Sequence, residues 1–441
     1  MGLVLNGGKV FAGGKLRRLD VRIENGKIAE VGTGLEGGRE IGCKNKLILP
    51  GAIDCHVHFR QPGMERKEDW EHGSRAAVAG GVTTVMDMPN SVPPTVSLAR
   101  LEEKRRYAAK SLCDYSFHFG AAAGNISDIK KCGLPSVKIY AAETTASKAA
   151  GAKLMLATFR AAREAGMTAA VHAEDMDIIR ANELLARNKG WNSVAYHSYI
   201  RSAESEAKAV ANALAAQRQA GSKLHICHLS SAAALELMEE ADRNLVSCEV
   251  TPHHLFLSKA GVAGLGNLAK VNPAIHSSDR KALLRALCAG AIDCVASDHA
   301  PHTIEEKSRP YWDAPSGAPG VETMLPLLLD ACNRDMLAIA DIVRALCSRP
   351  AEIFRLAGKG QIRTGFDADI AVVDMKARKA VENTMQQTKC KWTLFSGRHL
   401  RGWPVMTMVR GNIVYSKEGF AAGFKGAEVS VVRPDLRKAD K

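Results

Sequence analysis

Two closely spaced histidines near the start of the chain are the first residues whose types and spacing suggest chemistry. His56 and His58 follow the apolar segment Leu47-Ile48-Leu49-Pro50 and are separated by one residue. In a β-strand this spacing places both imidazoles on the same face, because side chains alternate between faces. Neutral imidazoles that converge at a strand end are suitable ligands for a borderline-soft cation such as zinc. A single His-x-His motif is a moderate indication, so the rest of the chain has to supply the other ligands.

Four further polar residues lie in, or directly after, apolar segments that are predicted to be strands: Lys138, His172, His228 and Asp298. Taken singly, a buried histidine is more often a hydrogen-bonded core residue, and an Asp after a strand is more often a helix cap. Lys138 is different, because a lysine within an apolar strand is rarely buried without a partner. If its amine is desolvated, it can react with carbon dioxide to give a carbamate, whose two oxygens can bridge two metals about 3.5–4 Å apart. With the histidine pair, these residues would complete a binuclear metal site.

Two residues near the same strand ends are weaker candidates for metal binding. Cys227 and Glu249 could meet beside His228 and form an accessory metal site. The alternative is that Cys227 is an ordinary buried thiol and that Glu249 is a carboxylate that supports a metal ligand. This alternative is at least equally expected, and both interpretations stay open. His253 and His254 follow a predicted strand, but nothing in their spacing assigns them a role.

The other polar residues near these motifs are interpreted as structural. Glu65 and Glu68 are predicted to lie in the solvated first turn of a helix, where the helix dipole favours acidic side chains. The histidines without an assigned function are His72, His118, His197, His225, His276 and His399.

The segments that must position these residues alternate between strand and helix from residue 51 to about residue 350. Eight apolar segments are predicted to be strands: 53–58, 82–87, 115–119, 136–141, 168–172, 223–228, 246–250 and 292–297. Helices are predicted at 65–79, 97–110, 146–165, 202–219, 231–242 and 278–289. This alternation predicts an α/β fold, a (β/α)8 TIM barrel, which places its chemistry at the C-terminal ends of the strands.

Both ends of the chain have a different pattern, that of short β-strands. Asn25-Gly26 between two alternating segments predicts a hairpin in the first 50 residues, and strand patterns return at 368–374 and 405–414. We therefore predict three segments: 1–50 as one half of a composite β-sandwich domain, 51–350 as the metal-dependent barrel, and 351–441 as the other half with a charged tail. The tail from about residue 425 is expected to be loosely ordered.

The composition is that of an ordinary globular protein. The 441 residues are 46% hydrophobic and 24% charged, and no apolar segment approaches the length of a membrane span. The net charge of +13 is spread along the chain without a basic, aromatic-rich segment, so no nucleic-acid partner is predicted. The 11 cysteines have no CxxC pairing, and the N-terminus has no export-signal pattern, so a cytoplasmic protein with free thiols is expected.

The order of the candidate ligands resembles that of the amidohydrolase superfamily, and the resemblance covers nearly the whole chain. Within it, several segments are similar to those of dihydroorotases of the lysine-carbamate type. These segments are 54–63 (DCHVHFRQPG), 88–90 (MPN), 270–273 (KVNP), 297–302 (SDHAPH) and 314–323 (APSGAPGVET).

The resemblance implies a substrate, a reaction and a partly assigned site. Dihydroorotases reversibly hydrolyse dihydroorotate to N-carbamoyl-L-aspartate, a step of pyrimidine biosynthesis. By similarity, a hydroxide on two zinc ions bridged by carbamylated Lys138 would attack the ring amide, with Asp298 as general acid and base. Arg60 and Asn90 would hold the substrate carboxylate, since a guanidinium fork suits a carboxylate. The residues placed near the ring by similarity are Asn272, His302, Ser316 and Gly317. A homodimer is also expected by resemblance.

Two other functions are considered for the same sequence. An allantoinase or hydantoinase would have the same scaffold and metal ligands, and segment 86–95 has some resemblance to allantoinases. Arg60 and His302 favour the dihydroorotase, because these positions differ in allantoinases. The second alternative is a catalytically silent scaffold, for example for aspartate transcarbamoylase. Such a protein should have lost metal ligands, whereas this chain has the full set.

Overall fold

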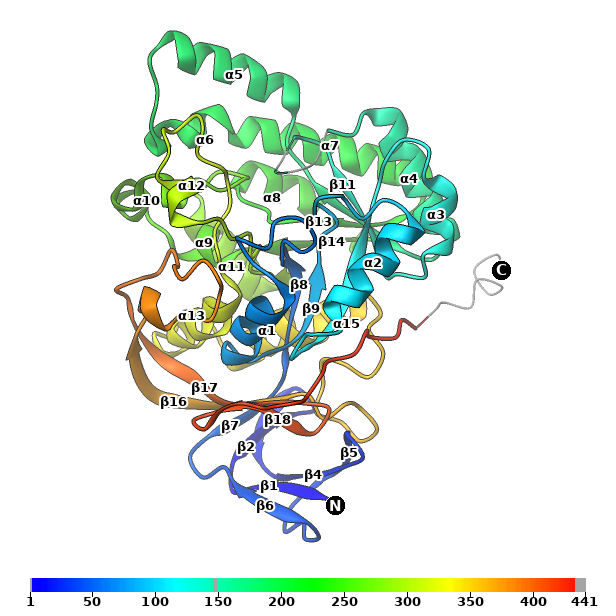
Figure 1. Ribbon diagram of the computed structural model, residues 1–441, viewed down its shortest axis with the longest axis vertical. Coiled ribbons are helices and arrows are strands. Elements are labelled where there is room, and N and C mark those ends of the chain that lie inside the picture. Colours follow the sequence, from blue (N-terminus) through cyan, green and yellow to red (C-terminus); the bar gives the residue numbers. More distant parts are fainter. Residues whose placement is uncertain (1, 144, 146–148, 433–441) are drawn as a thin grey trace.

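The protein is described by a computed structural model that covers residues 2–143, 145 and 149–432. Figure 1 shows two parts, a barrel wrapped in helices and a smaller β-rich part that contains the N-terminus. Within the described residues, none of the helices has the length and apolar character that a membrane span requires.

The centre of the larger part is an eight-stranded parallel sheet in which each strand neighbours the next one along the chain. Its strands are β8 (Ala52–Val57), β9 (Val82–Asp87), β10 (Asp114–Gly120), β11 (Ser136–Tyr140), β12 (Thr168–His172), β13 (Lys223–Ile226), β14 (Val246–Val250) and β15 (Cys294–Val295). A parallel bridge between Val57 and His299 brings the first and last strands together. The predicted TIM barrel is therefore confirmed, although the last strand is much shorter than predicted.

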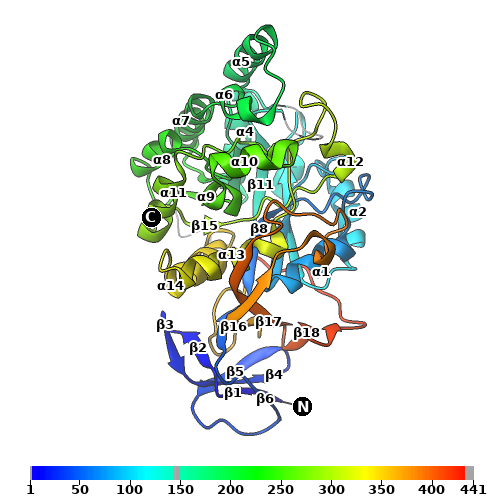
Figure 2. The same cartoon turned by 90° about the vertical axis from the view of Figure 1, so that its left-hand side faces the viewer.

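The helices that follow the strands cover the outside of the barrel (Figure 2). The predicted helices appear as α1 (Trp70–Ala79), α2 (Leu98–Ala108), α4 (Ala152–Glu164), α7 (Ala203–Ala220), α8 (Ala232–Glu239) and α11 (Arg280–Ala289). The first of them begins five residues later than predicted, because the Asp69 side chain caps it by accepting a hydrogen bond from His72 N. Residues 146–148, predicted as helical, lie outside the described residues.

Several helices were not predicted from the sequence. The two long ones are α5 (Met176–Asn188), which projects at the top of Figure 1, and α13 (Val321–Asn333), which packs against β17. The short ones are α3 (Ile126–Lys131), α6 (His197–Ile200), α9 (Pro252–Phe256), α10 (Lys259–Leu265), α12 (Ile304–Lys307), α14 (Ile339–Val343) and α15 (Arg349–Ile353). Short loop helices of this kind have little sequence periodicity to reveal them.

The smaller part is built from both ends of the chain, as predicted. One sheet has four strands, β1 (Leu3–Asn6), β4 (Asp20–Glu24), β5 (Lys27–Gly32) and β6 (Arg39–Gly42). The other combines β2 (Lys9–Ala12), β3 (Lys15–Arg18) and β7 (Leu47–Pro50) with β16 (Ile370–Ala380), β17 (His399–Val409), β18 (Asn412–Ser416) and β19 (Gly419–Phe420). The antiparallel pairing of β16 with β7 joins the two chain ends, and a shared apolar core lies between the sheets. The predicted hairpin is present, with positive φ at Asn25 and Gly26.

The expectation of a loosely ordered tail from residue 425 is wrong for the described part of the tail. Gly426 N donates a hydrogen bond to Ser111 O, and Val429 is buried in an apolar cluster with the barrel strands. Glu428 accepts two hydrogen bonds from Arg105, at 2.7 and 2.8 Å. The ion pair and the apolar contact anchor the tail, and only its last part, 433–441, lies outside the described residues.

Candidate active site

The polar residues selected from the sequence meet at the C-terminal end of the barrel. His56 and Lys138 lie within β8 and β11, His172 ends β12, and His228 and Asp298 follow β13 and β15. All of them are buried. The ring centroids of His56 and His228 are 5.1 Å apart, and those of His172 and His228 are 4.7 Å apart. The structure therefore brings the four histidines and Asp298 of the predicted ligand set into one cavity, whereas Lys138 does not line this cavity and donates to Cys227 Sγ.

The orientation of the first two imidazoles suits metal binding. The Nδ1 atom of His58 lies 2.6 Å from Asn90 Oδ1, and Nδ1 of His56 contacts Glu249 Oε1. Their Nε2 atoms lie 3.1 and 3.3 Å from Asp298 Oδ1. Metal-binding histidines are commonly held in this way, with one nitrogen fixed by an acceptor and the other free for the cation.

The other two imidazoles face each other across the cluster. His172 Nδ1 lies 2.9 Å from His228 Nε2, and His172 Nε2 lies 2.8 Å from Glu174 Oε2. Burial lowers the pKa of all four histidines, so their rings are neutral near pH 7. Neutral rings provide the lone pairs that a divalent cation needs, and these nitrogens with the Asp298 carboxylate fit such an ion.

Glu174 and Arg201 hold the His172 side of the cluster in place, and neither residue was predicted from the sequence. The Arg201 guanidinium donates to Glu174 Oε2, which also contacts His172. Burial alone would raise the pKa of Glu174, but Arg201 and His172 outweigh burial and lower this pKa to about 2. The only sequence cue was a Glu two residues after a candidate ligand.

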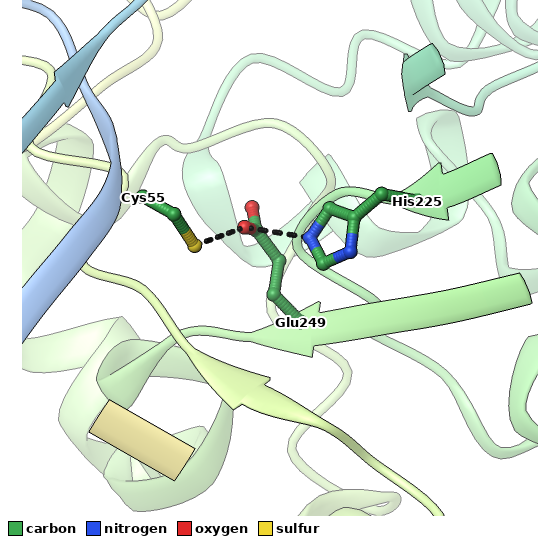
Figure 3. Close-up of side chains that lie close together, drawn as sticks. All are labelled: Cys55, His225 and Glu249. Carbon is green, nitrogen blue, oxygen red and sulfur yellow. Dashed lines mark hydrogen bonds and ion pairs between the residues drawn. The ribbon is translucent and has the colours of Figure 1, made fainter. Parts of the chain in front are cut away.

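Glu249 connects several of the buried groups beneath the cluster (Figure 3). Its Oε2 lies 3.1 Å from His225 Nε2 and 3.3 Å from Cys55 Sγ, while Oε1 contacts His56. Burial alone would raise the pKa of Glu249, but His56 and His225 outweigh it and lower this pKa well below its usual range. Glu249 is thus an ionised acceptor that fixes the His56 ring. His225, which was predicted to be structural, is a further hydrogen-bond partner of Glu249.

The predicted meeting of Cys227 with Glu249 is also present. Potential ligand atoms of His56, Cys227 and Glu249 lie within 4.8 Å of one another. Cys227 Sγ accepts a hydrogen bond of 2.9 Å from Lys138 Nζ, and burial raises the pKa of this thiol to about 12. The geometry is compatible with both interpretations of the pair, a further ligand set and a support for Lys138 and His56.

Arg60 reaches the cavity with one unused donor. Its Nε donates to Pro301 O at 3.1 Å, and its Nη2 lies 3.2 Å from His302 Nε2. The Nη1 atom is buried and has no hydrogen-bond partner among the described residues. Because an unpaired buried guanidinium nitrogen is costly, this atom indicates a binding position for an anionic acceptor.

Of the remaining predicted substrate residues, Asn90, Asn272, Ser316 and Gly317 line the same cavity. His302 does not line it: its buried ring contacts Arg60 and Ser316 O from behind the cavity wall. Asn90 donates to Thr145 O at 3.0 Å and accepts from His58, so both ends of its amide are engaged. Asn272 Oδ1 lies 3.0 Å from His197 Nε2, and the Asn272 amide NH2 group, which has no hydrogen-bond partner among the described residues, can serve a ligand. The cavity is lined by His56, His58, Arg60, Asn90, Tyr140, Thr145, His172, His228, Asn272, Asp298, Ala300, Ser316 and Gly317.

Three site residues have a left-handed backbone, which is uncommon for residues other than glycine. The φ angles of Arg60, His228 and Asp298 are 62°, 38° and 45°. Each follows a barrel strand directly or after a short extension, and the left-handed turn directs its side chain toward the cavity. Such strained positions cluster at functional sites.

The interpretation of Glu65 and Glu68 as a solvated first helical turn is wrong. Both precede the helix, since Asp69 is its cap. Glu68 is fully buried and accepts hydrogen bonds from the Thr388 hydroxyl and the Lys389 backbone N–H. Its carboxylate therefore anchors the 388–389 segment beside the barrel, a tertiary contact that local sequence does not reveal. Glu65 Oε1 accepts from the Gly63 backbone N–H at 2.9 Å.

Comparison with known proteins agrees with this fold and site. Residues 47–414 match the model of the amidohydrolase family, and the chain belongs to this family. It is a metal-dependent cyclic amidohydrolase, and its curated relatives are named dihydroorotase.

Relatives of this name occur in several archaea. The dihydroorotase of Halobacterium salinarum is 39% identical over 427 residues, covering 95% of this chain and 98% of the relative. The dihydroorotase of Pyrococcus abyssi is 37% identical, covering 92% of this chain and 93% of the relative.

The solved structures that resemble the chain have other names. The L-hydantoinase (dihydropyrimidinase) of Arthrobacter aurescens has a TM-score of 0.93 at 27% identity and covers 97% of this chain and 99% of its own. The D-hydantoinase of a Thermus species has a TM-score of 0.90 at 26% identity, and the match covers 98% of this chain and 99% of the hydantoinase. The comparisons therefore leave two candidate substrates on one scaffold.

Proposed function

We propose that the chain is a dihydroorotase that interconverts (S)-dihydroorotate and N-carbamoyl-L-aspartate in de novo pyrimidine biosynthesis. The observation that carries this proposal is the unpaired, buried Nη1 of Arg60 in the cavity. Dihydroorotate has a carboxylate that such a donor would bind, whereas unsubstituted hydantoin has none. The names of the archaeal relatives support the same substrate.

We also propose that the cluster holds two zinc ions. Their ligands would be His56, His58, Lys138, His172, His228 and Asp298. The Lys138 amine would attack carbon dioxide, form an N–C bond and lose a proton to water, giving the bridging carbamate. Two bound cations would provide a Lewis acid and make hydroxide available near neutral pH. The neutral imidazoles and their fixed orientations support this assignment.

In the proposed reaction, Asp298 moves the proton. Asp298 is buried and lines the cavity, so its carboxylate is placed to exchange a proton with groups bound there. One oxygen stays near His56 and His58, and the other takes the proton from the attacking water. Asp298 then gives this proton to the ring nitrogen that leaves. Ring closure uses the same residue in reverse.

The roles of the cavity residues follow from their free donors and acceptors. Arg60 would bind the substrate carboxylate, and the NH2 group of Asn272 would contact the ring. Asn90 would approach the carboxylate after exchanging its contact with Thr145. Ser316 and Gly317 would complete the ring site, and His302 would act on it through its contacts with Arg60 and Ser316 O.

Several finer predictions from the sequence stay proposals. These are the division of the chain at residues 50 and 350, a homodimer, an association with aspartate transcarbamoylase, and a cytoplasmic location. A hydantoinase is the second candidate function, favoured by the two solved structures that share its fold.

A substrate panel with a matched variant tests the proposal. The wild type should open dihydroorotate, with little activity on hydantoin or allantoin. Arg60→Gln should raise KM for dihydroorotate by on the order of 100-fold, because a charge-assisted hydrogen bond is worth roughly 1.5–3 kcal/mol. The control Lys417→Met, at an exposed lysine, should behave like the wild type. Opening of hydantoin or allantoin by a wild type that leaves dihydroorotate intact would refute the proposal.

A further inference from the structure

A buried lysine lies behind the wall of the substrate cavity. Lys307, the last residue of α12, is 1% exposed, and its Nζ donates to the carbonyls of Lys270, Pro315 and Gly317 at 2.9, 3.0 and 3.0 Å. Burial lowers the pKa of Lys307. Three acceptors nevertheless require three N–H donors, and only the ammonium form has them. The site is therefore built around a buried positive charge.

Lys270 acts on the same segment from its other side. Its Nζ donates to Tyr311 O at 2.6 Å and to Ala314 O at 2.7 Å, and it lies 4.5 Å from the centroid of the Tyr311 ring. Among the described residues, neither Lys270 nor Lys307 forms an ion pair with a carboxylate. Two ammonium groups thus bind carbonyls of the 311–317 segment and keep their net charge.

The direction of these carbonyls decides what the cavity presents to a ligand. Ser316 and Gly317 line the cavity, whereas Lys307 does not, so the carbonyls that it binds point away from the cavity. Carbonyl oxygens that faced a carboxylate would repel it. Gly317 keeps this arrangement tight: its φ is +134°, its N–H donates to Lys270 O at 2.9 Å, and an added Cβ would lie 2.5 Å from Ala300 O.

We propose that Lys307 is a positioning and specificity-determining residue, which holds the Pro315 and Gly317 carbonyls away from the cavity and makes the site favour anionic over neutral ring substrates. The inference rests on the proposed function, since it concerns recognition of the substrate carboxylate. Lys307 acts through the 315–317 backbone and its charge, without touching the substrate.

The test compares two ligands that differ by one carboxylate. Dihydroorotate is anionic, and dihydrouracil is the same ring without the carboxylate. KM for dihydroorotate and the inhibition constant of dihydrouracil are measured for the wild type, Lys307→Met, Lys307→Arg and the exposed-lysine control Lys417→Met. Lys307→Met removes the donors and the charge at similar length, while Lys307→Arg retains both.

The expected result is a selective loss of anion recognition. Lys307→Met should raise KM for dihydroorotate by on the order of ten-fold, a difference of about 1.4 kcal/mol, and change dihydrouracil inhibition less than about three-fold. Lys307→Arg should recover most of the loss. Equal weakening of both ligands, or no change in either, would overturn the proposal.

A second variant keeps the test valid if Lys307→Met does not fold. Lys270→Met is then compared with the wild type in the same two measurements, because this half-buried lysine binds neighbouring carbonyls of the same segment. A rise of about three-fold in KM for dihydroorotate in Lys270→Met, without a matching change in the inhibition constant of dihydrouracil, supports the proposal. An unchanged ratio of these two constants overturns it. Wild-type protein that does not open dihydroorotate refutes the proposed function, whereas an unselective Lys307→Met effect in an active dihydroorotase refutes only this inference.

Discussion

Replacement of Glu174 by glutamine should remove a pH-dependent part of the stability. Glu174 lies between His172 Nε2, at 2.8 Å, and the guanidinium of Arg201, and it is 1% exposed. Glutamine keeps the shape of the side chain but removes its charge. The substitution therefore leaves the Arg201 guanidinium buried without its ionic partner.

The magnitude follows from the pKa of Glu174, which is about 2 instead of 4.5. Because each pH unit between these values corresponds to ~1.36 kcal/mol, the ionised carboxylate stabilises the folded state by about 3 kcal/mol at neutral pH. Since the folded-state pKa is the lower one, this stabilisation is fully present above pH 4.5 and is lost as the pH falls toward 2. Loss of one partner of a buried ion pair typically has a similar cost.

The assay is urea unfolding of the chelator-treated wild type and Glu174→Gln between pH 7 and pH 2.5. Their difference in unfolding free energy should be about 3 kcal/mol at pH 7 and should shrink steadily below pH 4.5. Chelation removes the contribution of any metal bound at His172. A difference that is independent of pH would refute the ionised state of Glu174 and the reasoning built on it.

Three further predictions concern other parts of the molecule. Glu249→Gln should weaken metal binding by roughly 10–100-fold in chelator competition, because it loosens His56, a proposed metal ligand, whereas the exposed control Glu305→Gln should leave the affinity unchanged. Equal metal affinities in both variants would contradict the proposal that Glu249 orients His56. Lys359→Met should lower the unfolding free energy by about 3–5 kcal/mol, because it leaves three carboxylates without their shared cation; a loss under about 1 kcal/mol would contradict this. Gly317→Ala should raise KM at least about ten-fold, because the new Cβ would lie 2.5 Å from Ala300 O, and an unchanged KM would show that the segment can shift.

The barrel and the polar residues at its strand ends could be predicted, because the patterns that identify them are local in the sequence. A strand buried on both faces must be almost continuously apolar, so Lys138 and the histidines stand out within such segments. Their order along the chain then follows the order of the strands around the barrel. The β-rich part was predictable for the same reason, from alternating residues and the Asn25-Gly26 turn.

The supporting residues could not be predicted, because their partners are distant in the sequence. Glu68 looks like a helix-dipole acid until Thr388 is seen beside it, 320 residues away. Lys307 looks like a surface lysine at the end of a short acidic helix, but its acceptors belong to a folded loop. The tail after residue 425 was misjudged in the same way, since its anchoring by Arg105 depends on tertiary contact.

The most direct test of the account is metal analysis combined with a dihydroorotate assay on the wild type and Asp298→Ala, with Asp177→Ala as an exposed control. The account predicts about two metals per chain and turnover of dihydroorotate in the wild type and the control. Asp298→Ala should keep its fold and lose turnover, because Asp298 is the one carboxylate among the described residues that line the cavity. A wild type that binds no metal, or an Asp298→Ala variant that retains turnover, would contradict the account.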